Sequence, residues 1–179
     1  MSENKKTTVD VSTVISGDVK SVDFSFDFCP ECIDKDIIFP APLKVTGRVY
    51  EKASAKNGSQ NLVMANIALK GKYVTKCARC LENIDVPVDM YAEYSVASEL
   101  QNDEDESEDV LLAPGGVLDI GEAADSLFFM NVPSKHLCSE SCKGLCQGCG
   151  KNLNTEECVC DNKNIDPRLA VLKKLLDKQ

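Results

Sequence analysis

Ten cysteines that all fall in closely spaced pairs constrain this 179-residue chain more than any other feature. No stretch approaches the roughly 20 apolar residues of a transmembrane helix, and the N-terminal residues are polar, unlike a secretory leader. We therefore expect a cytoplasmic protein without membrane contact. In a reducing cytosol, clustered cysteines are more often metal ligands or redox centres than disulfides. The pairs are Cys29-x2-Cys32, Cys77-x2-Cys80, Cys138-x3-Cys142, Cys146-x2-Cys149 and Cys158-x-Cys160.

The C-terminal pairs predict a structural zinc site. Zinc takes four ligands at the corners of a tetrahedron, and a C-x2-C turn presents two thiolates to one ion. The predicted ligands are Cys146, Cys149, Cys158 and Cys160. Cys138 and Cys142 are alternates, because they could replace one pair or join the other four in a cluster of two metals and six cysteines. The spacing by itself does not choose among these arrangements.

The two C-x2-C pairs nearer the N-terminus predict a second metal site. Each pair falls at the end of a predicted strand, so strand pairing could bring the two turns together around one ion. The ligands of this site would be Cys29, Cys32, Cys77 and Cys80. The alternative is that each pair consists of small buried thiols, since a free cysteine packs as a modest hydrophobe.

A dithiol oxidoreductase is a competing interpretation of the same pairs. A redox C-x-x-C motif usually opens a helix within a βαβ unit, and neither N-terminal pair is followed by a helical pattern of apolar residues. His136 is the single histidine of the chain, and no nucleophile motif accompanies it that would make a catalytic triad. We therefore predict no catalytic residues and no small-molecule substrate.

Apolar residues at alternate positions predict strands in the first half of the chain, over residues 22–28, 43–49, 63–73 and 84–96. Asp119 and Glu122 have the spacing of a capping pair for a helix over about 120–130. We predict an α+β fold, in which a mainly antiparallel β-sheet or partial barrel precedes a helix, a Cys-rich zinc-binding loop and a C-terminal helix. The predicted parts are a β domain (1–98), an acidic linker (99–117), a helix packed on the sheet (118–134) and the Cys-rich module with its C-terminal helix (135–179).

The net charge of −9 conceals two blocks of opposite sign. Residues 44–79 hold eight bases and one acid, a net charge of +7, whereas residues 80–134 hold 14 acids and no base. On the predicted strands the bases share the outward positions with Tyr50, so strand pairing would build a face that attracts phosphate and offers a ring for stacking. The predicted RNA-binding residues are Lys44, Arg48, Lys70, Lys72, Lys76 and Arg79.

The alternative to an RNA surface is an ordinary solvated sheet face, with lysines that protect an edge from aggregation. The stretch ELQNDEDESED at 99–109 contains seven acids. We expect this stretch to be a solvated loop, or a segment that covers the basic face and excludes weakly bound polyanions.

Several motifs follow one another along most of the chain. They are CARCL at 77–81, an alternating strand, an acidic linker, CKGLC at 142–146, CGKNLN at 149–154, CVC at 158–160 and DPRLAVLKKLL at 166–176. In this order they resemble the YceD family, whose members are called large ribosomal RNA subunit accumulation proteins. The resemblance implies a non-catalytic ribosome-biogenesis factor that promotes accumulation of 23S rRNA by contacting precursor rRNA or an early protein of the large subunit.

The chain departs from the family pattern in two places. Members often have Pro inside the knuckle where this chain has Gln147 and Gly148, and Cys29 and Cys32 are not part of the pattern. Some members lack most of the C-terminal cysteines, which implies that the metal is scaffold and does no chemistry. The alternative function is a zinc-stabilised module that binds a basic ribosomal protein without contacting RNA.

Overall fold

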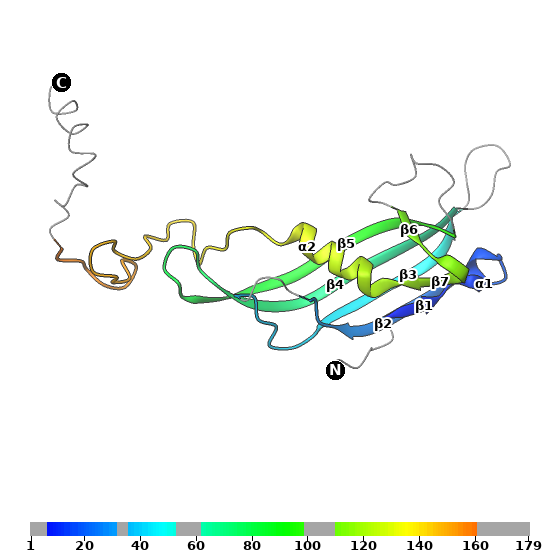
Figure 1. Cartoon of the computed structure of the whole chain (residues 1–179), viewed down its shortest axis with the longest axis horizontal. Helices are drawn as coiled ribbons and strands as arrows, with labels where there is room; N and C mark the ends of the chain where they lie inside the picture. Colours follow the sequence, from blue (N-terminus) through cyan, green and yellow to red (C-terminus); the bar gives the residue numbers. More distant parts are fainter. Residues whose placement is uncertain (1–6, 32–35, 53–61, 99–109, 161–179) are drawn as a thin grey trace, which may run out of the picture. The chain divides into compact units, whose positions relative to one another are not determined.

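The computed structural model describes residues 7–31, 36–52, 62–98 and 110–160. The chain divides into two units, which are drawn in Figure 1. The sheet unit comprises residues 1–75 and 85–134, and the Cys-rich unit comprises residues 76–84 and 135–179. The predicted C-terminal helix and the acidic stretch 99–109 lie outside the described residues.

The sheet unit is built on an open five-stranded sheet with the order β2-β3-β4-β5-β6 (Figure 1). Its strands are β2 (Ser21–Phe28), β3 (Leu43–Lys52), β4 (Leu62–Lys76), β5 (Asn83–Ala97) and β6 (Val110–Leu112). β3 pairs antiparallel with both β2 and β4, whereas the short β6 runs parallel to β5. This mostly antiparallel α+β architecture confirms the predicted fold class, and among the described strands the sheet stays open.

The alternation of apolar and polar residues determines the two faces of the sheet. The register places Phe26 opposite Val45 and Asp23 opposite Arg48, so each parity stays on one face across neighbouring strands. Val45 and Ile67 are fully buried on the inner face, whereas the charged residues of the other parity are exposed. The four predicted strands are therefore present with the predicted faces.

Helix α2 (Ile120–Asn131) lies across the inner face of the sheet and completes its core (Figure 1). The ring centroid of Phe128 lies 5.7 Å from that of Tyr73 in an edge-on arrangement and 5.4 Å from that of Phe39. Both aromatic pairs have the separation at which such rings attract each other. Met130 of the same helix is 65% exposed.

The start of α2 shows the predicted cap. The Asp119 carboxylate accepts hydrogen bonds from the backbone N–H groups of Gly121 and Glu122, two donors that have no partner inside the helix. Neither α2 nor any other described helix is long and apolar enough to cross a membrane.

Several short elements were not predicted. β1 (Thr8–Asp10) pairs antiparallel with β7 (Val117–Asp119) in a second sheet, while α1 (Ser12–Ile15) and the 3-10 turn η2 (Pro114–Gly116) complete the set. Elements of three or four residues are too short for a periodic pattern to be recognised. They contribute to the core all the same, because Val11 and Val14 are buried there.

Gly47 lies at a place where strand β3 is in close contact with its two neighbouring strands. It lies on the inner face of β3, opposite Phe24 of β2 and Ile67 of β4. A Cβ atom at this position would overlap the carbonyl oxygen of Asn66 and the ring of Phe24. Glycine is therefore required here for the aromatic ring to lie against the strand.

Candidate metal centres

Eight of the nine described cysteines gather in two groups within the Cys-rich unit, and all nine are free thiols. In each group, the four sulfur atoms lie within 4.8 Å of one another. The upstream cluster consists of Cys77, Cys80, Cys138 and Cys142, and the downstream cluster consists of Cys146, Cys149, Cys158 and Cys160. Both clusters are compatible with metal binding, because four thiolates are a common ligand set of tetrahedral metal sites.

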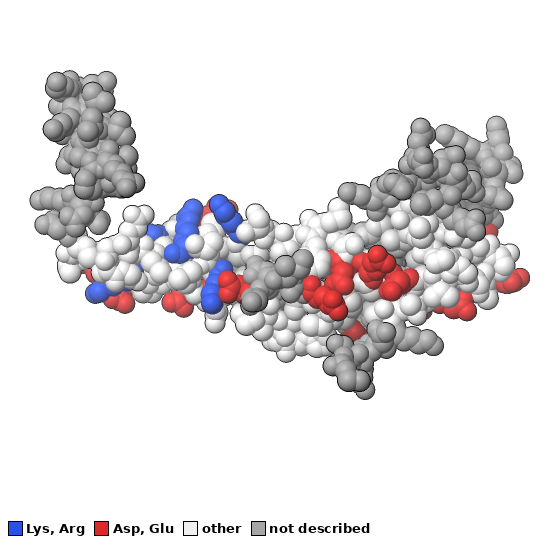
Figure 2. All heavy atoms as spheres, in the orientation of Figure 1, with Lys and Arg blue, Asp and Glu red and all other residues white. Residues whose placement is uncertain are grey.

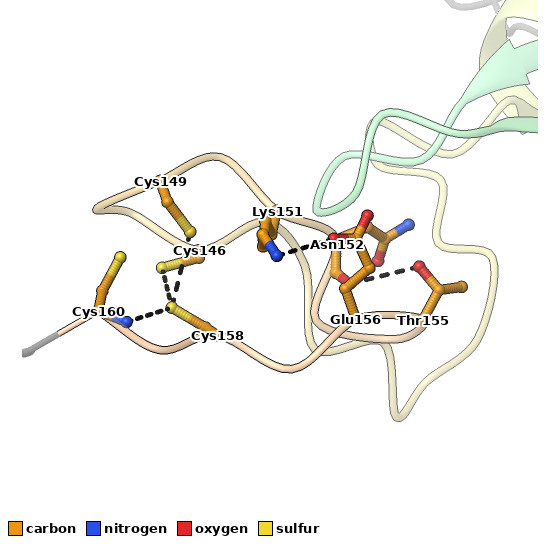
Figure 3. A network of polar contacts seen from close by, with 8 residues as sticks. All are labelled: Cys146, Cys149, Lys151, Asn152, Thr155, Glu156, Cys158 and Cys160. Carbon is orange, nitrogen blue, oxygen red and sulfur yellow. Dashed lines mark hydrogen bonds and ion pairs between the residues drawn. The ribbon is translucent and has the colours of Figure 1, made fainter.

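The downstream cluster is formed by a C-x2-C turn and the segment that follows it (Figure 3). The Sγ of Cys158 lies 3.2 Å from that of Cys146 and 3.6 Å from that of Cys149. Backbone N–H groups also point at the sulfurs: Gly148 donates to Cys146 Sγ at 3.4 Å, and Cys160 donates to Cys158 Sγ at 3.3 Å. The structure thus brings together the four cysteines that were the first choice of ligands from the sequence, and it groups the alternates Cys138 and Cys142 elsewhere.

The upstream cluster joins two parts of the chain that are distant in sequence. The Sγ of Cys77 lies 3.8 Å from that of Cys142, and the Sγ of Cys80 lies 3.6 Å from that of Cys138. Cys77 is fully buried, and its sulfur accepts a hydrogen bond of 3.4 Å from the backbone N–H of Cys138. From the sequence, Cys138 and Cys142 were alternates for the downstream site alone.

The two C-x2-C turns have the same backbone hydrogen bonds. In each turn, the N–H of the first cysteine donates to the carbonyl of the fifth residue after it, at 2.8 Å for both Cys77 and Cys146. The N–H of the fourth residue after it, which is Leu81 or Gly150, donates back to the carbonyl of that cysteine at 2.9 Å. That fourth residue has a positive φ in both turns, 62° at Leu81 and 75° at Gly150.

Two polar side chains hold the second half of the upstream cluster in place. The Nη1 of Arg79 donates to the carbonyl oxygens of Glu140, at 3.1 Å, and Cys142, at 2.9 Å. The Nδ2 of Asn154 donates to the Sγ of Cys142 at 3.3 Å, while its Oδ1 accepts from the backbone N–H of Lys143 at 2.8 Å. Arg79 belongs to the first turn and Asn154 to the loop of the downstream cluster, so both neighbouring segments hold this loop.

The segment between the clusters ties them to each other. Only three residues separate Cys142 from Cys146. Between them, the backbone of Leu145 forms an antiparallel bridge with Asn152 and donates to the carbonyl of Arg79 at 3.1 Å. The CKGLC motif therefore gives one cysteine to each cluster.

Local hydrogen bonds divide the upstream thiols into two kinds. The pKa of Cys77 falls to about 6, first because of the backbone N–H of Cys80 and next because of that of Cys138. The pKa of Cys138 rises to about 12, mainly because its side chain hydrogen-bonds with that of Cys142 and then with that of Cys80. Some thiolates are thus favoured and their neighbours stay protonated, since several negative charges cannot share this space without a cation.

The downstream thiols divide in the same way. The pKa of Cys146 falls to about 6, mainly through the backbone N–H of Cys149. The pKa of Cys160 rises to about 12, mainly through the hydrogen bond between its side chain and that of Cys149. A divalent cation would stabilise the thiolate form of all four groups, as metal sites generally do for their ligands.

The second site predicted from the sequence is only partly described. Cys29 is exposed and belongs to the sheet unit, and Cys32 lies outside the described residues, so their pairing with Cys77 and Cys80 stays a prediction. The sulfurs that do surround Cys77 and Cys80 come from the loop at 138–142. The CARCL and CGKNL motifs share a turn structure, but no sequence signal pairs the CARCL turn with the loop at 138–142.

The predicted RNA-binding residues fall in both units. Lys44, Arg48, Lys70 and Lys72 lie at exposed or half-exposed positions on the outer face of the sheet, whereas Lys76 and Arg79 belong to the Cys-rich unit. Figure 2 shows that most of the Lys and Arg side chains visible in that view lie over the Cys-rich unit. The described bases of that unit are Lys76, Arg79, Lys135, Lys143 and Lys151.

Acidic residues of neighbouring strands interleave with the bases of the sheet. Arg48 Nε lies 2.5 Å from Asp23 Oδ1 of β2. On β5, Asp89 lies 3.5 Å from the Nζ of Lys70, and Asp85 lies 2.9 Å from the Nζ of Lys72. Lys52 forms a further pair with Glu93 at 3.9 Å, and Tyr50 also donates a hydrogen bond to Glu93. The block that is basic in sequence therefore becomes a face of mixed charge.

The fold and the two cysteine clusters define an α+β protein with a separate Cys-rich unit whose clusters are compatible with metal binding. More specifically, the chain belongs to the YceD family: the family model described as large ribosomal RNA subunit accumulation protein YceD matches residues 65–176, a span that contains both clusters. The family description indicates a role in the accumulation of large-subunit rRNA. No curated protein and no solved structure matches the chain.

Proposed function

We propose that this chain is a non-catalytic ribosome-biogenesis factor that promotes accumulation of 23S rRNA. The observation that carries the proposal is the family match over residues 65–176. The cysteine clusters support a scaffold role, because four sulfur ligands fill a tetrahedral site and leave no open position for a reacting water or substrate. A role in assembly of the large subunit supports a cytoplasmic location.

Zinc is the metal that best fits the downstream cluster. Thiolate ligands favour zinc, copper(I) and iron–sulfur centres over hard cations such as magnesium or calcium. A single zinc ion would hold the C-x2-C turn of Cys146 and Cys149 against Cys158 and Cys160. Its contribution would be the folding of this segment, because a structural zinc site supplies stability directly.

Direct contact with precursor rRNA is the first mode of action that we propose. The candidate contacts are Lys44, Arg48, Lys70, Lys72 and Lys76. The side chains in the ion pairs of Arg48, Lys70 and Lys72 are between 55% and 74% exposed, and exposed pairs of this kind contribute little to stability. A phosphate can therefore replace the carboxylate partner at little cost. Arg79 is assigned to the cysteine loop instead, because its guanidinium donates to two carbonyls there.

The test is a salt titration of binding to a 23S rRNA fragment. Direct contact predicts an affinity that falls steeply with salt, with a slope that tracks the number of phosphates contacted. The substitutions Lys70→Glu and Lys72→Glu should each weaken binding and reduce that slope by about one contact. Binding that does not respond to salt or to these substitutions would refute the RNA contact.

A protein partner is the second candidate, and the acidic residues of the same face favour it. Asp85 and Asp89 are exposed on β5 next to the lysines of β4, so the face also suits a basic ribosomal protein. The double variant Asp85→Asn with Asp89→Asn separates the candidates: RNA binding should strengthen, whereas binding of a basic protein should weaken. A dithiol oxidoreductase would differ from both, since its thiols would react rapidly without release of metal.

A further inference from the structure

We propose that Cys77, Cys80, Cys138 and Cys142 bind a second zinc ion, separate from the ion of the downstream cluster. The site does not depend on the proposed function, because it concerns only the Cys-rich unit. In this proposal the partners of Cys77 and Cys80 are Cys138 and Cys142, and no longer Cys29 and Cys32 as predicted from the sequence.

The spacing of the sulfurs is that of a tetrahedral site. With Zn–S bonds of about 2.3 Å, two sulfurs of a regular tetrahedron lie about 3.8 Å apart. The distances are 3.8 Å between Cys77 and Cys142 and 3.6 Å between Cys80 and Cys138. All four sulfurs also lie within 4.8 Å of one another. In each of these two pairs, one sulfur belongs to the turn at Cys77–Cys80 and the other to the loop at 138–142. One ion at the centre would therefore link both segments.

The upstream turn is built like the turn of the downstream cluster. Both turns have the same pair of backbone hydrogen bonds and a positive φ at the same position. Gly150 adopts this φ without a steric penalty, but Leu81 is the one described residue other than glycine with a positive φ. A non-glycine residue keeps this conformation only where its surroundings impose it. A metal that bridges Cys77 and Cys80 would provide that constraint.

Second-sphere hydrogen bonds complete the site. A zinc ion with four thiolates carries a net charge of −2, and N–H groups directed at the sulfurs offset this charge. Cys77 accepts from the backbone N–H of Cys138, and Cys142 accepts from the side-chain amide of Asn154. Asn154 is therefore a positioning residue that touches an expected ligand and no metal.

The small apolar core of this region gives a physical reason for a second ion. The buried cluster consists of Cys77, Cys80 and Cys142, with Leu145 packed against them. A core of this size cannot hold two chain segments together by hydrophobic burial alone, and natural domains of this kind use a metal or disulfides.

Metal analysis of the purified full-length chain tests the proposal. The wild type should contain two zinc ions per chain, and the double variants Cys138→Ser with Cys142→Ser and Cys158→Ser with Cys160→Ser should each contain one. The matched control is Cys29→Ser with Cys32→Ser, which should keep two ions. One ion in the wild type, or loss of an ion in the Cys29 and Cys32 variant alone, would overturn the proposal.

Cadmium-113 NMR of the exchanged wild-type protein keeps the proposal testable if a cysteine variant does not fold. Two resonances in the range of four-sulfur coordination are expected, and a single such resonance would overturn it. Asn154→Asp places a carboxylate beside the Cys142 sulfur, so a chelator should remove one ion several-fold faster than in wild type and the other at an unchanged rate. Thr155→Ala is the control, because the Thr155 hydroxyl donates its hydrogen bond to the carbonyl of Asn152 and to no cysteine among the described residues. Equal acceleration in both variants would refute the role of Asn154.

Discussion

The two C-x2-C turns of this chain share their local structure and differ in where their partners come from. The downstream turn is completed by cysteines close in sequence, with contacting sulfurs 9 and 12 residues apart. The upstream turn is completed by a loop whose sulfurs come from 58 and 65 residues away. A turn that presents two thiolates is thus a property of a few consecutive residues, whereas the second pair of ligands depends on the path of the whole chain.

The intervening chain in the upstream case is itself a folded structure. Residues 85–134 include most of β5 and all of β6, β7 and α2, which belong to the sheet unit. Closing a flexible loop of 58 residues costs about 1.6 kcal/mol more than closing one of 9 residues. The strands and the helix described within this span shorten the flexible chain that has to be closed and so reduce this cost. The described residues of the two units bury different groups, a large apolar core in the sheet unit and mainly cysteines in the Cys-rich unit.

Metal removal should have the largest effect and should separate the two units. Because few apolar residues are buried in the part of the Cys-rich unit that the structure describes, a strong chelator is expected to abolish protection of the amides in 76–84 and 135–160. The strands and α2 should keep their protection, since they pack around their own core. Hydrogen exchange followed by NMR or mass spectrometry measures both. Simultaneous loss of protection in the sheet would show that the units do not fold independently.

Gly47→Ala is expected to affect the sheet unit and to spare the Cys-rich unit. We expect it to lower the free energy of unfolding of the sheet unit by about 3 kcal/mol. The new methyl group would overlap the Asn66 carbonyl and the Phe24 ring, so the sheet unit should be destabilised. The zinc content should not change. Gly17→Ala is the control, because Gly17 has a positive φ of 82° but no atom within 4 Å of the added carbon. Chemical denaturation with a probe in the sheet gives the difference between the two variants.

Substitution of Gly144 should destabilise the Cys-rich unit more than substitution of Gly150. Both residues have a positive φ, so alanine should cost about 1 kcal/mol at either position. At Gly144 the added carbon would also lie 3.0 Å from the carbonyl oxygen of Arg79, whereas at Gly150 nothing lies within 4 Å. The exchange rate of the Leu145 amide, which donates to that carbonyl, reports the difference. Equal effects would mean that the neighbouring turn shifts without cost.

Leu81→Gly should stabilise the upstream turn slightly. Glycine removes the backbone strain of the positive φ in the folded state, and it also makes the unfolded chain more flexible. The first effect should be the larger, so the net gain in stability should be about 0.5 kcal/mol. The matched variant Gly150→Leu should destabilise the downstream turn, if the two turns are equivalent as their hydrogen bonds indicate. Exchange of the Cys77 and Cys146 amides measures the two effects, and changes of the same sign would contradict the equivalence.

The exposed ion pairs of the sheet should have the smallest effect. The hydrogen bond with Arg48 holds the pKa of Asp23 below its ordinary value of 3.8. A carboxyl whose pKa is lowered by folding contributes stability above its unfolded pKa, and this contribution is lost as the pH falls through the folded pKa. Arg48→Ala should therefore raise the pKa of Asp23 toward 3.8, as measured by NMR titration, with little change in stability above pH 5. A pKa that stays low would assign the shift to another group.

Residue patterns predicted the parts of the fold that repeat with a clear period. The strands with alternating Phe24, Phe26 and Phe28, and the Asp119 cap of α2, are present as expected. The charge of a face depends less on local sequence than the strand pattern does. The charge pattern located the basic residues on the outer positions of β3 and β4, but it could not show that β2 and β5 would place acids beside them.

The sequence by itself predicted the turns and the strand faces, and it favoured the downstream set of four cysteines over its alternatives, because each depends on residues within a short stretch of chain. Only the tertiary structure decided which cysteines complete the upstream cluster and which charges become neighbours. Both outcomes depend on strand order and chain path, which bring together residues that no local pattern relates. The same C-x2-C motif therefore had a predictable shape in both places and a predictable partner in only one.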